Sequence, residues 1–220
     1  VSIFGLMGSG RTELMEALAG KDDIVSGKLF LDGHDITKLS IAQRIKMGLG
    51  LVPEDRQKDG LIQQMSVGSN LSLASFFKYL KIGLLNKNVE GKNISSAIKD
   101  VRVKTSGPKM PIESLSGGNQ QKVVIGRMLL TNPKAILLDE PTRGIDVGAK
   151  SEIFNLLREQ SQKGLAVLFV TSEINEAINW SDRIVVMSRG ELVEIFENKK
   201  VERSDIMSAA EASVKKGVML

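Results

Sequence analysis

Eight residues near the start of the chain follow the P-loop pattern G-x-x-x-x-G-K-[ST] at every fixed position but one: Gly5-Leu6-Met7-Gly8-Ser9-Gly10-Arg11-Thr12. The lysine of the pattern is Arg11. An apolar strand is predicted before this turn, over residues 1–5, and a helix after it, over residues 11–18. Glycines let the backbone wrap around phosphate groups, and the N–H groups at a helix start attract anions. The segment therefore predicts an α/β fold with a phosphate-binding turn.

Two further motifs support this interpretation. The signature Leu115-Ser116-Gly117-Gly118-Asn119-Gln120-Gln121 begins 24 positions before Asp139, which ends the apolar run Ile136-Leu137-Leu138 and precedes Glu140. The Gly-Gly turn entering a helix predicts a second phosphate-binding surface. An apolar strand that ends in Asp-Glu is a usual place for a magnesium ion and a catalytic water. A dinucleotide-binding G-x-G-x-x-G is excluded, because Glu13 stands at its third glycine position.

In this order, followed by Pro141-Thr142 and Ile145-Asp146, the motifs resemble the nucleotide-binding domain of an ATP-binding cassette (ABC) ATPase over nearly the whole chain. The runs Val52-Pro53-Glu54-Asp55-Arg56 and Gly117-Gly118-Asn119-Gln120-Gln121 look like the second, C-terminal cassette of the fused ATPases that power ribose, galactose and xylose importers. The resemblance implies a P-loop NTPase of the ABC type, with a mostly parallel core sheet, antiparallel β elements and an inserted helical subdomain.

The resemblance also assigns roles, with ATP and Mg²⁺ as cofactors. Two cassettes face each other head to tail, and each ATP lies between the P-loop of one and the signature of the other. The residues expected around the nucleotide of this chain's own P-loop are Gly5, Gly8, Ser9, Gly10, Arg11, Thr12 and Glu13. Thr12 and Asp139 are expected to hold the metal, and Glu140 to accept the proton of the attacking water. Ser116, Gly117, Gly118 and Asn119 are expected to contact the partner's ATP, and Asp146 to couple the two sites.

Three positions depart from the family pattern. The phosphate-clamping lysine is Arg11, the loop glutamine is Glu54, and the histidine after the fourth strand is replaced in Val170-Thr171-Ser172-Glu173. We take Glu54 and Glu173 as the catalytic-site residues at these positions. The chain's one histidine, His34, follows the turn Asp32-Gly33 and is expected at the surface. At ~4 Å and an effective dielectric of ~20, each added carboxylate would repel a phosphate charge by about 4 kcal/mol. The sequence therefore predicts weak or absent hydrolysis at this P-loop.

The resemblance implies three partners: a second cassette fused upstream, membrane permease subunits, and indirectly an external sugar-binding protein. The chain opens on the strand that feeds the P-loop, so the earlier antiparallel strands and their adenine-stacking aromatic are expected upstream. No apolar run approaches the ~18 residues needed to span a bilayer. We expect a peripheral protein at the cytoplasmic face of the membrane. The net charge is +4, and the lysine pairs at 199–200 and 215–216 are expected in solvent, with no nucleic-acid binding.

Hydrophobic patterning predicts three parts: a first P-loop core part over 1–53, a helical subdomain ending in the signature helix over 54–130, and a second core part with a C-terminal hairpin and helix over 131–220. Strands are predicted at 49–52, 135–138, 166–170, 183–187 and 191–196, and a hairpin around Asp32-Gly33. The stripe Leu73, Phe76, Phe77 and Leu80 predicts a buried helix face after a cap at Ser69-Asn70. The polar residues 86–93 predict a loop.

Two other functions remain open. The chain can be a fully competent ABC ATPase in which Arg11 and Glu173 are tolerated. It can also be a soluble ABC protein acting on ribosomes or DNA, or another P-loop enzyme. A GTPase is disfavoured, because Asn86-Lys87-Asn88-Val89 lacks the aspartate of Asn-Lys-x-Asp.

Overall fold

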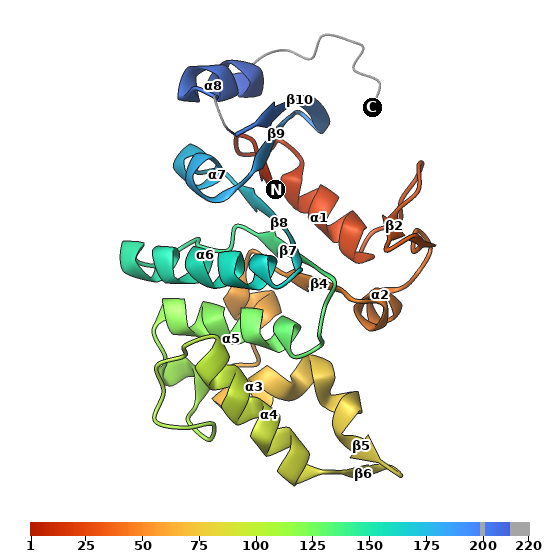
Figure 1. Cartoon of the computed structure of the whole chain (residues 1–220), viewed down its shortest axis with the longest axis vertical. Helices are drawn as coiled ribbons and strands as arrows, with labels where there is room; N and C mark the ends of the chain where they lie inside the picture. Colours follow the sequence, from red (N-terminus) through yellow and green to blue (C-terminus); the bar gives the residue numbers. More distant parts are fainter. Residues whose placement is uncertain (199–200, 212–220) are drawn as a thin grey trace.

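The computed structural model describes residues 1–198 and 201–211, so the lysine pairs at 199–200 and 215–216 lie outside the described residues. Its centre is a six-stranded sheet in the order β10-β9-β1-β8-β7-β4 (Figure 1). The strands are β1 (Ser2–Phe4), β4 (Leu49–Val52), β7 (Ala135–Asp139), β8 (Ala166–Thr171), β9 (Arg183–Ser188) and β10 (Glu191–Glu197). All neighbours pair in parallel except β9 and β10, which form the expected hairpin. The predicted ABC-type fold is confirmed.

Helices cover both faces of this sheet. They are α1 (Arg11–Ala19), α2 (Ile41–Met47), α5 (Gly117–Leu129), α6 (Val147–Gln162), α7 (Ile174–Trp180) and α8 (Arg203–Glu211). Strand β7 displays the two-sided burial: Leu137 packs in the core that contains Met15 of α1, whereas Ile136 and Leu138 pack in the core built from α5 and α6. A strand buried on both faces must be apolar at every position, which explains the continuous run in the sequence.

A mainly helical region follows β4 and occupies the end of the molecule opposite α8 (Figure 1). Its elements are a π-helix (η1, Arg56–Gly60), α3 (Val67–Ser72), a 3₁₀ helix (η2, Leu73–Tyr79), α4 (Lys87–Asp100) and a second 3₁₀ turn (η3, Ile112–Ser114). A small hairpin, β5 (Leu80–Lys81) with β6 (Leu84–Leu85), joins η2 to α4. The predicted hairpin around Asp32-Gly33 is β2 (Phe30–Leu31) with β3 (His34–Asp35), and it is confirmed.

The loop predicted at 86–93 is wrong. Asn86 caps α4 by accepting a hydrogen bond from the N–H of Val89 at 3.2 Å, and the helix then runs to Asp100. Of its described residues only Ile94 and Ala97 are buried, so a helix this exposed carries a polar sequence that resembles a loop.

The buried stripe predicted after residue 70 is also wrong. Leu73, Phe76, Phe77 and Leu80 are 39%, 42%, 45% and 43% exposed. The segment is a 3₁₀ helix with about three residues per turn, so an i, i+3, i+4, i+7 spacing does not form one face. The predicted cap at Ser69-Asn70 is replaced by Ser66, whose hydroxyl accepts from the N–H of Ser69. This region therefore presents an apolar surface instead of burying one.

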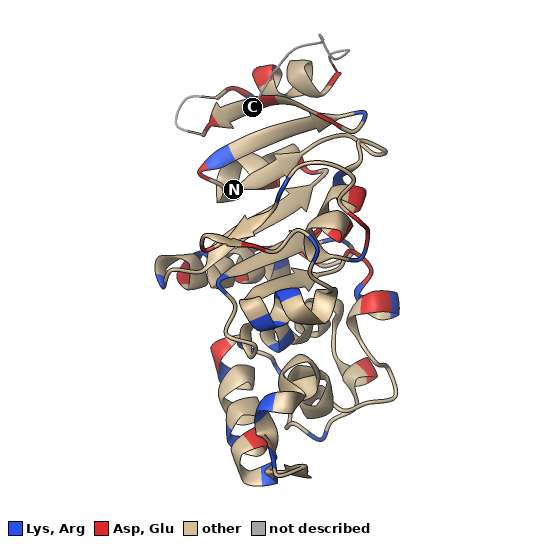
Figure 2. Ribbon diagram, turned by 90° about the vertical axis from the view of Figure 1, so that its right-hand side faces the viewer, with Lys and Arg blue, Asp and Glu red and all other residues tan. Residues whose placement is uncertain are grey.

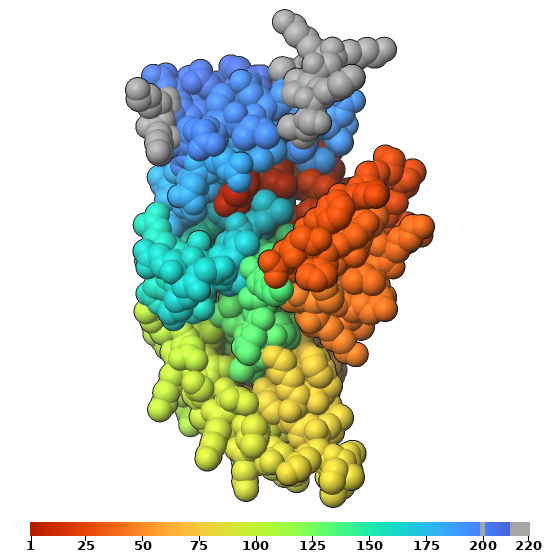
Figure 3. Space-filling model, turned by 45° about the vertical axis from the view of Figure 1, so that its right-hand side comes forward, coloured from red at the N-terminus to blue at the C-terminus, as the bar shows by residue number. Residues whose placement is uncertain are grey.

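Charges of both signs are spread along the chain, and one face has a recess. Figure 2 shows acidic and basic residues at both ends of the ribbon, without segregation of either sign. Figure 3 shows the N-terminal residues, in red, set back between the C-terminal strands and the projecting hairpin β2–β3. None of the helices in the described ranges combines the length and the hydropathy that a bilayer crossing requires.

Candidate functional site

The P-loop joins β1 to α1 at the carboxyl edge of the sheet. Gly8 and Gly10 have φ values of 76° and 91°, in the left-handed region that favours glycine. A Cβ on Gly5 would stand 2.4 Å from the carbonyl oxygen of Met187 and 2.5 Å from Oγ of Ser9. Gly10 begins α1 with no capping side chain in the described part of the chain. The turn therefore keeps the tight backbone and open helix start that bind phosphate.

Arg11 does not extend from this turn but folds back over it. Its Nη1 donates to the carbonyl oxygen of Gly5, to that of Leu6 at 2.7 Å and to Oγ of Ser9 at 2.9 Å. Its Nη2 lies 3.1 Å from Oε1 of Glu140. The residue is 9% exposed. In the P-loop pattern the residue at this position binds phosphate. The guanidinium of Arg11 instead contacts acceptors of the loop itself and the candidate general base, Glu140.

Asp139 and Thr12, the two expected metal ligands, lie next to each other beside the loop. Asp139 is 3% exposed, and its Oδ1 has no hydrogen-bond partner in the described structure. Burial raises the pKa of Asp139 from its ordinary 3.8 to about 6, although a hydrogen bond with the side chain of Thr12 opposes the rise. In the described ranges no three acidic or histidine side chains gather. A lone buried carboxylate oxygen beside a hydroxyl fits Mg²⁺, which is commonly held by one or two carboxylates plus substrate phosphates.

Glu140 follows in a strained conformation. Its φ is 42°, rare for a residue with a side chain, and its N–H donates to the carbonyl oxygen of Val170 at 3.1 Å. Burial raises the pKa of the Glu140 carboxyl, and hydrogen bonds with the side chain and backbone of Ser172, together with the charge of Arg11, oppose the rise. Sequence reasoning missed Ser172. Its signal was its place directly after the apolar run of β8, where side chains reach the carboxyl edge of the sheet.

Glu173 and Glu54 are each paired with a cation. Glu173 pairs with Lys150 of α6 and its side chain is 54% exposed, and Glu54, in the loop after β4, pairs with Arg143. The sequence led us to expect two uncompensated negative charges near the phosphates. The structure differs, because Lys150 and Arg143 offset them, and it places Ser172 instead of Glu173 against Glu140.

A buried carboxylate behind Glu140 connects four segments. Glu176 of α7 is 6% exposed and accepts hydrogen bonds from the hydroxyls of Thr142 at 2.6 Å and Thr171 at 2.7 Å. Lys150 lies 3.1 Å from its Oε1. These contacts hold together the loop after β7, the end of β8, α6 and α7. The sequence pattern gave no sign of this network, because each partner comes from a different element.

The signature lies at the start of α5, with Ser116 as the residue before the first turn. No side chain of the described residues caps this end, and Asn119 donates to Oγ of Ser116 at 3.0 Å. A Cβ on Gly117 would stand 2.7 Å from Nη2 of Arg56, and one on Gly118 would stand 2.5 Å from Cβ of Ala149. The two glycines therefore let neighbouring segments approach the helix closely.

The other predicted residues fall beside these two groups. Asp146 caps α6 by accepting from the N–H of Ala149 at 2.9 Å, so it lies next to the signature. Glu13 is exposed on the first turn of α1. Within the described chain no side-chain hydrogen bond or ion pair joins Ser116, Gly117 or Gly118 to the P-loop. The P-loop and the signature are thus two separate candidate phosphate-binding surfaces.

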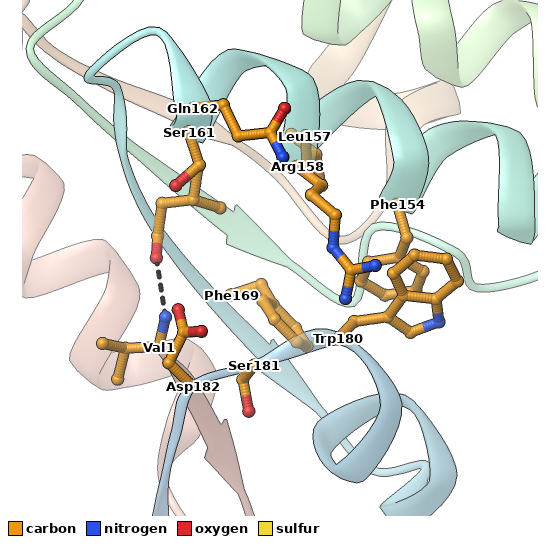
Figure 4. Close-up of a pocket in the computed structure, with 11 residues that line it drawn as sticks. Val1, Phe154, Leu157, Arg158, Ser161, Gln162, Phe169, Trp180, Ser181 and Asp182 are labelled. Carbon is orange, nitrogen blue, oxygen red and sulfur yellow. Dashed lines mark hydrogen bonds between the residues drawn. The ribbon is translucent and has the colours of Figure 1, made fainter. Parts of the chain in front are cut away.

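A hollow at the opposite, amino edge of the sheet does not share this chemistry (Figure 4). Trp180 stacks on Phe154 with ring centroids 5.2 Å apart, and the guanidinium of Arg158 lies 5.1 Å from the Trp180 ring. The amino group of Val1 donates to the carbonyl oxygen of Val167 at 3.1 Å. Neither the phosphate-type loop nor the Asp-Glu pair lies at this edge, so the carboxyl edge remains the candidate site.

Comparisons with known proteins agree with this geometry. The model of the family described as ABC transporter matches residues 1–143. The ribose import ATP-binding protein of Geobacillus kaustophilus is 40% identical over 210 residues, which cover 96% of this chain and 42% of that protein. The xylose import ATP-binding protein of Paraburkholderia xenovorans is 42% identical over 211 residues, 96% of this chain and 41% of its own length. The chain spans about two fifths of the length of these relatives.

Solved structures show the same fold. A dimeric ATP-binding cassette in a post-hydrolysis state with ADP and Pi superposes with a TM-score of 0.78 at 27% identity, over 91% of this chain and 85% of that one. A second ATP-binding cassette of an ABC transporter reaches 0.81 at 24% identity, over 96% and 88% of the two chains.

Proposed function

Because the chain belongs to the ABC transporter ATPase family, we propose that it is a cassette that energises sugar import through a membrane permease. It binds MgATP at the P-loop around Arg11 and supplies its signature to the active site of a partner cassette. The observation that carries the proposal is the contrast between the two surfaces. The signature helix start is uncapped by any described side chain, whereas Arg11 and Glu140 hold each other in an ion pair.

At the P-loop, Asp139 and Thr12 hold Mg²⁺ and the glycine turn holds the phosphates. MgATP supplies the phosphoanhydride bond, and Glu140 is placed to accept the proton of an attacking water. Arg11 pairs with that carboxylate, and the neighbouring hydrogen-bond partner is Ser172 instead of a histidine. We therefore propose weak hydrolysis at this site.

At the signature, Ser116, Gly117 and Gly118 donate to the γ-phosphate of ATP bound on the partner, and Asp146 couples the two sites. Apolar residues at the same edge support a facing cassette: Leu6, Met7 and Val147 are 42%, 90% and 79% exposed. The relatives are more than twice as long as this chain, which supports a partner fused in one polypeptide. The C-terminal position of this cassette is proposed from the motif resemblance alone.

The permease docks on the apolar surface of the helical region, formed by Leu73, Phe76, Phe77 and Leu80. Exposure of two adjacent phenylalanines supports a partner there, because such residues are otherwise placed in a core. In this proposal residues 54–130 act as a subdomain between the core parts 1–53 and 131–220. The protein then lies at the cytoplasmic face of the membrane, and the sugar-binding protein acts through the permease from outside.

One observation favours a second candidate, a fully competent ATPase. Glu54 and Glu173 are each paired with a cation, so neither places an unbalanced charge against the nucleotide.

The test is made in the assembled transporter with Ser116→Arg and Arg11→Ala. Loss of one transition-state donor costs about 10²–10³ in rate, so Ser116→Arg should reduce ATPase activity and uptake by that factor, while Arg11→Ala retains a large share. Equal damage by both variants would favour two hydrolysing sites.

A further inference from the structure

Arg56 connects two loops that meet the nucleotide of the partner cassette in the proposed function. It is the first residue of the π-helix η1 after β4. Its Nη1 donates to the carbonyl oxygen of Arg143 at 2.8 Å and its Nη2 to that of Gly144 at 3.3 Å. The same Nη2 lies where a side chain on Gly117 would stand, 2.7 Å from the position of its Cβ. One guanidinium therefore fills the space between the loop after β7 and the start of the signature helix.

The segment that carries Arg56, residues 54–60, is fixed along α5. Nε2 of Gln57 donates to Oε1 of Gln120 at 3.3 Å, and a Cβ on Gly60 would touch Val124 at 3.2 Å. At its other end Glu54 pairs with Arg143. Within residues 54–60, three residues thus lie against the signature helix, and two, Glu54 and Arg56, contact the 143–144 loop. A π-helix is rare and costly to form, and it frequently occurs at functional sites.

The charge of Arg56 does not explain its position. It lies at the N-terminal end of α5, where the helix dipole disfavours a cation, and no carboxylate in the described structure pairs with it. The contacts of Arg56 depend instead on the shape of its guanidinium group. A guanidinium presents donors in a planar, rigid fork, so it can bond two successive carbonyl groups while its Nη2 end lies against Gly117. A lysine ammonium has the charge without this geometry.

We propose that Arg56 is a positioning residue that holds the start of the signature helix and the 143–146 loop in one fixed relation. Ser116 and Asp146 then reach the partner's nucleotide together, and a shift of residues 54–60 moves both. This inference rests on the proposed function, because it assumes that the signature serves the partner's site. It assigns Glu54 a role as the counter-charge of Arg143 within the same connection.

The experiment compares Arg56→Ala, Arg56→Lys and Lys58→Ala in the assembled transporter. Lys58 is exposed on the same π-helix, so its variant removes an equal charge without the two carbonyl contacts. Small misplacements far from the chemistry cost up to about 10²-fold in rate. We expect Arg56→Ala to lower kcat about 10- to 100-fold with KM for MgATP within about twofold, Arg56→Lys to stay impaired, and Lys58→Ala to match the parent.

Each outcome decides one point. Full activity of Arg56→Ala, or its recovery in Arg56→Lys, would overturn the positioning role. A rise in KM at unchanged kcat would do the same, since it indicates binding and not placement. Ser116→Arg, measured in parallel, distinguishes failure of the proposed signature function from failure of the positioning role of Arg56. If it retains turnover, the signature-donating function fails. If it abolishes turnover while Arg56→Ala keeps the parent's kcat, only the positioning role of Arg56 fails. Thermal midpoints of all variants identify any that lose activity through unfolding.

Discussion

Arg11 and Glu140 form an ion pair across the P-loop, with Nη2 and Oε1 3.1 Å apart and side chains only 10% and 11% exposed. The residue in the lysine position and the candidate general base therefore compensate each other's charge in a buried place. In that environment the pair matters for folding as well as for chemistry, because removing one partner leaves an uncompensated charge.

A double-mutant cycle measures this coupling. Arg11→Ala should lower the free energy of unfolding by about 3–5 kcal/mol, because Glu140 loses its only ion-pair partner among the described residues. Glu140→Ala should cost less, since Arg11 keeps its bonds to Gly5, Leu6 and Ser9. In urea unfolding, the double variant should lose less free energy of unfolding than the two single variants lose together. The exposed pair Lys21 and Glu16 is the control and should couple far more weakly, because solvent screens it. Additive losses at Arg11 and Glu140 would show that the pair is not coupled.

The raised pKa of Asp139 predicts a pH dependence of stability. The folded protein binds this proton more tightly than the unfolded chain, so the stabilisation is complete below about pH 4 and is lost as pH rises toward the folded pKa of about 6. At about 1.4 kcal/mol per unit, the change is at most about 3 kcal/mol. Asp139→Asn should remove this decline in unfolding experiments between pH 4 and 7 without Mg²⁺. Asp22→Asn, at an exposed site, should keep it. Parallel curves for the parent and Asp139→Asn would contradict the shift.

Two helix glycines should respond to alanine with opposite signs. In Gly118→Ala the new methyl group meets Cβ of Ala149 at 2.5 Å, so we expect a loss of about 1–3 kcal/mol from overpacking. Gly91 lies in α4 with open space around its Cβ position, so Gly91→Ala should gain about 0.5–1 kcal/mol from helix propensity. Chemical denaturation compares the two. A neutral Gly118→Ala would indicate that α5 and α6 can separate at no cost.

Glu173 and Glu176 share Lys150 but differ in burial, which makes them a matched pair. Glu176→Ala leaves Lys150, Thr142 and Thr171 without their buried acceptor and should cost about 3–5 kcal/mol. Glu173→Ala removes a carboxylate that is 54% exposed and should cost about 1 kcal/mol or less. Unfolding midpoints measure both. If Glu173→Ala also abolished ATP turnover, the carboxylate would act in the site despite its contact with Lys150.

The sequence predicted those parts of the molecule in which one element determines its own pattern. The apolar runs of β7 and β8 identify strands because both faces are covered, and the glycines of the P-loop identify a turn because of their backbone angles. The sequence did not predict those features that depend on which other elements pack against a segment. The polar sequence of α4 carries no mark of its exposed position, and Leu73 to Leu80 fit a buried face only if the helix is α and not 3₁₀. Ser172 and the inward fold of Arg11 depend on where Glu140 lies, which no local pattern encodes.

Strand β7 has a consequence for motion. It pairs with β4 on one side and β8 on the other, and both of its faces are covered by helices. We expect its amide hydrogens to exchange with solvent only when the whole domain opens, as core strands do. Asp139 and Glu140 are therefore attached to the slowest-exchanging part of the chain.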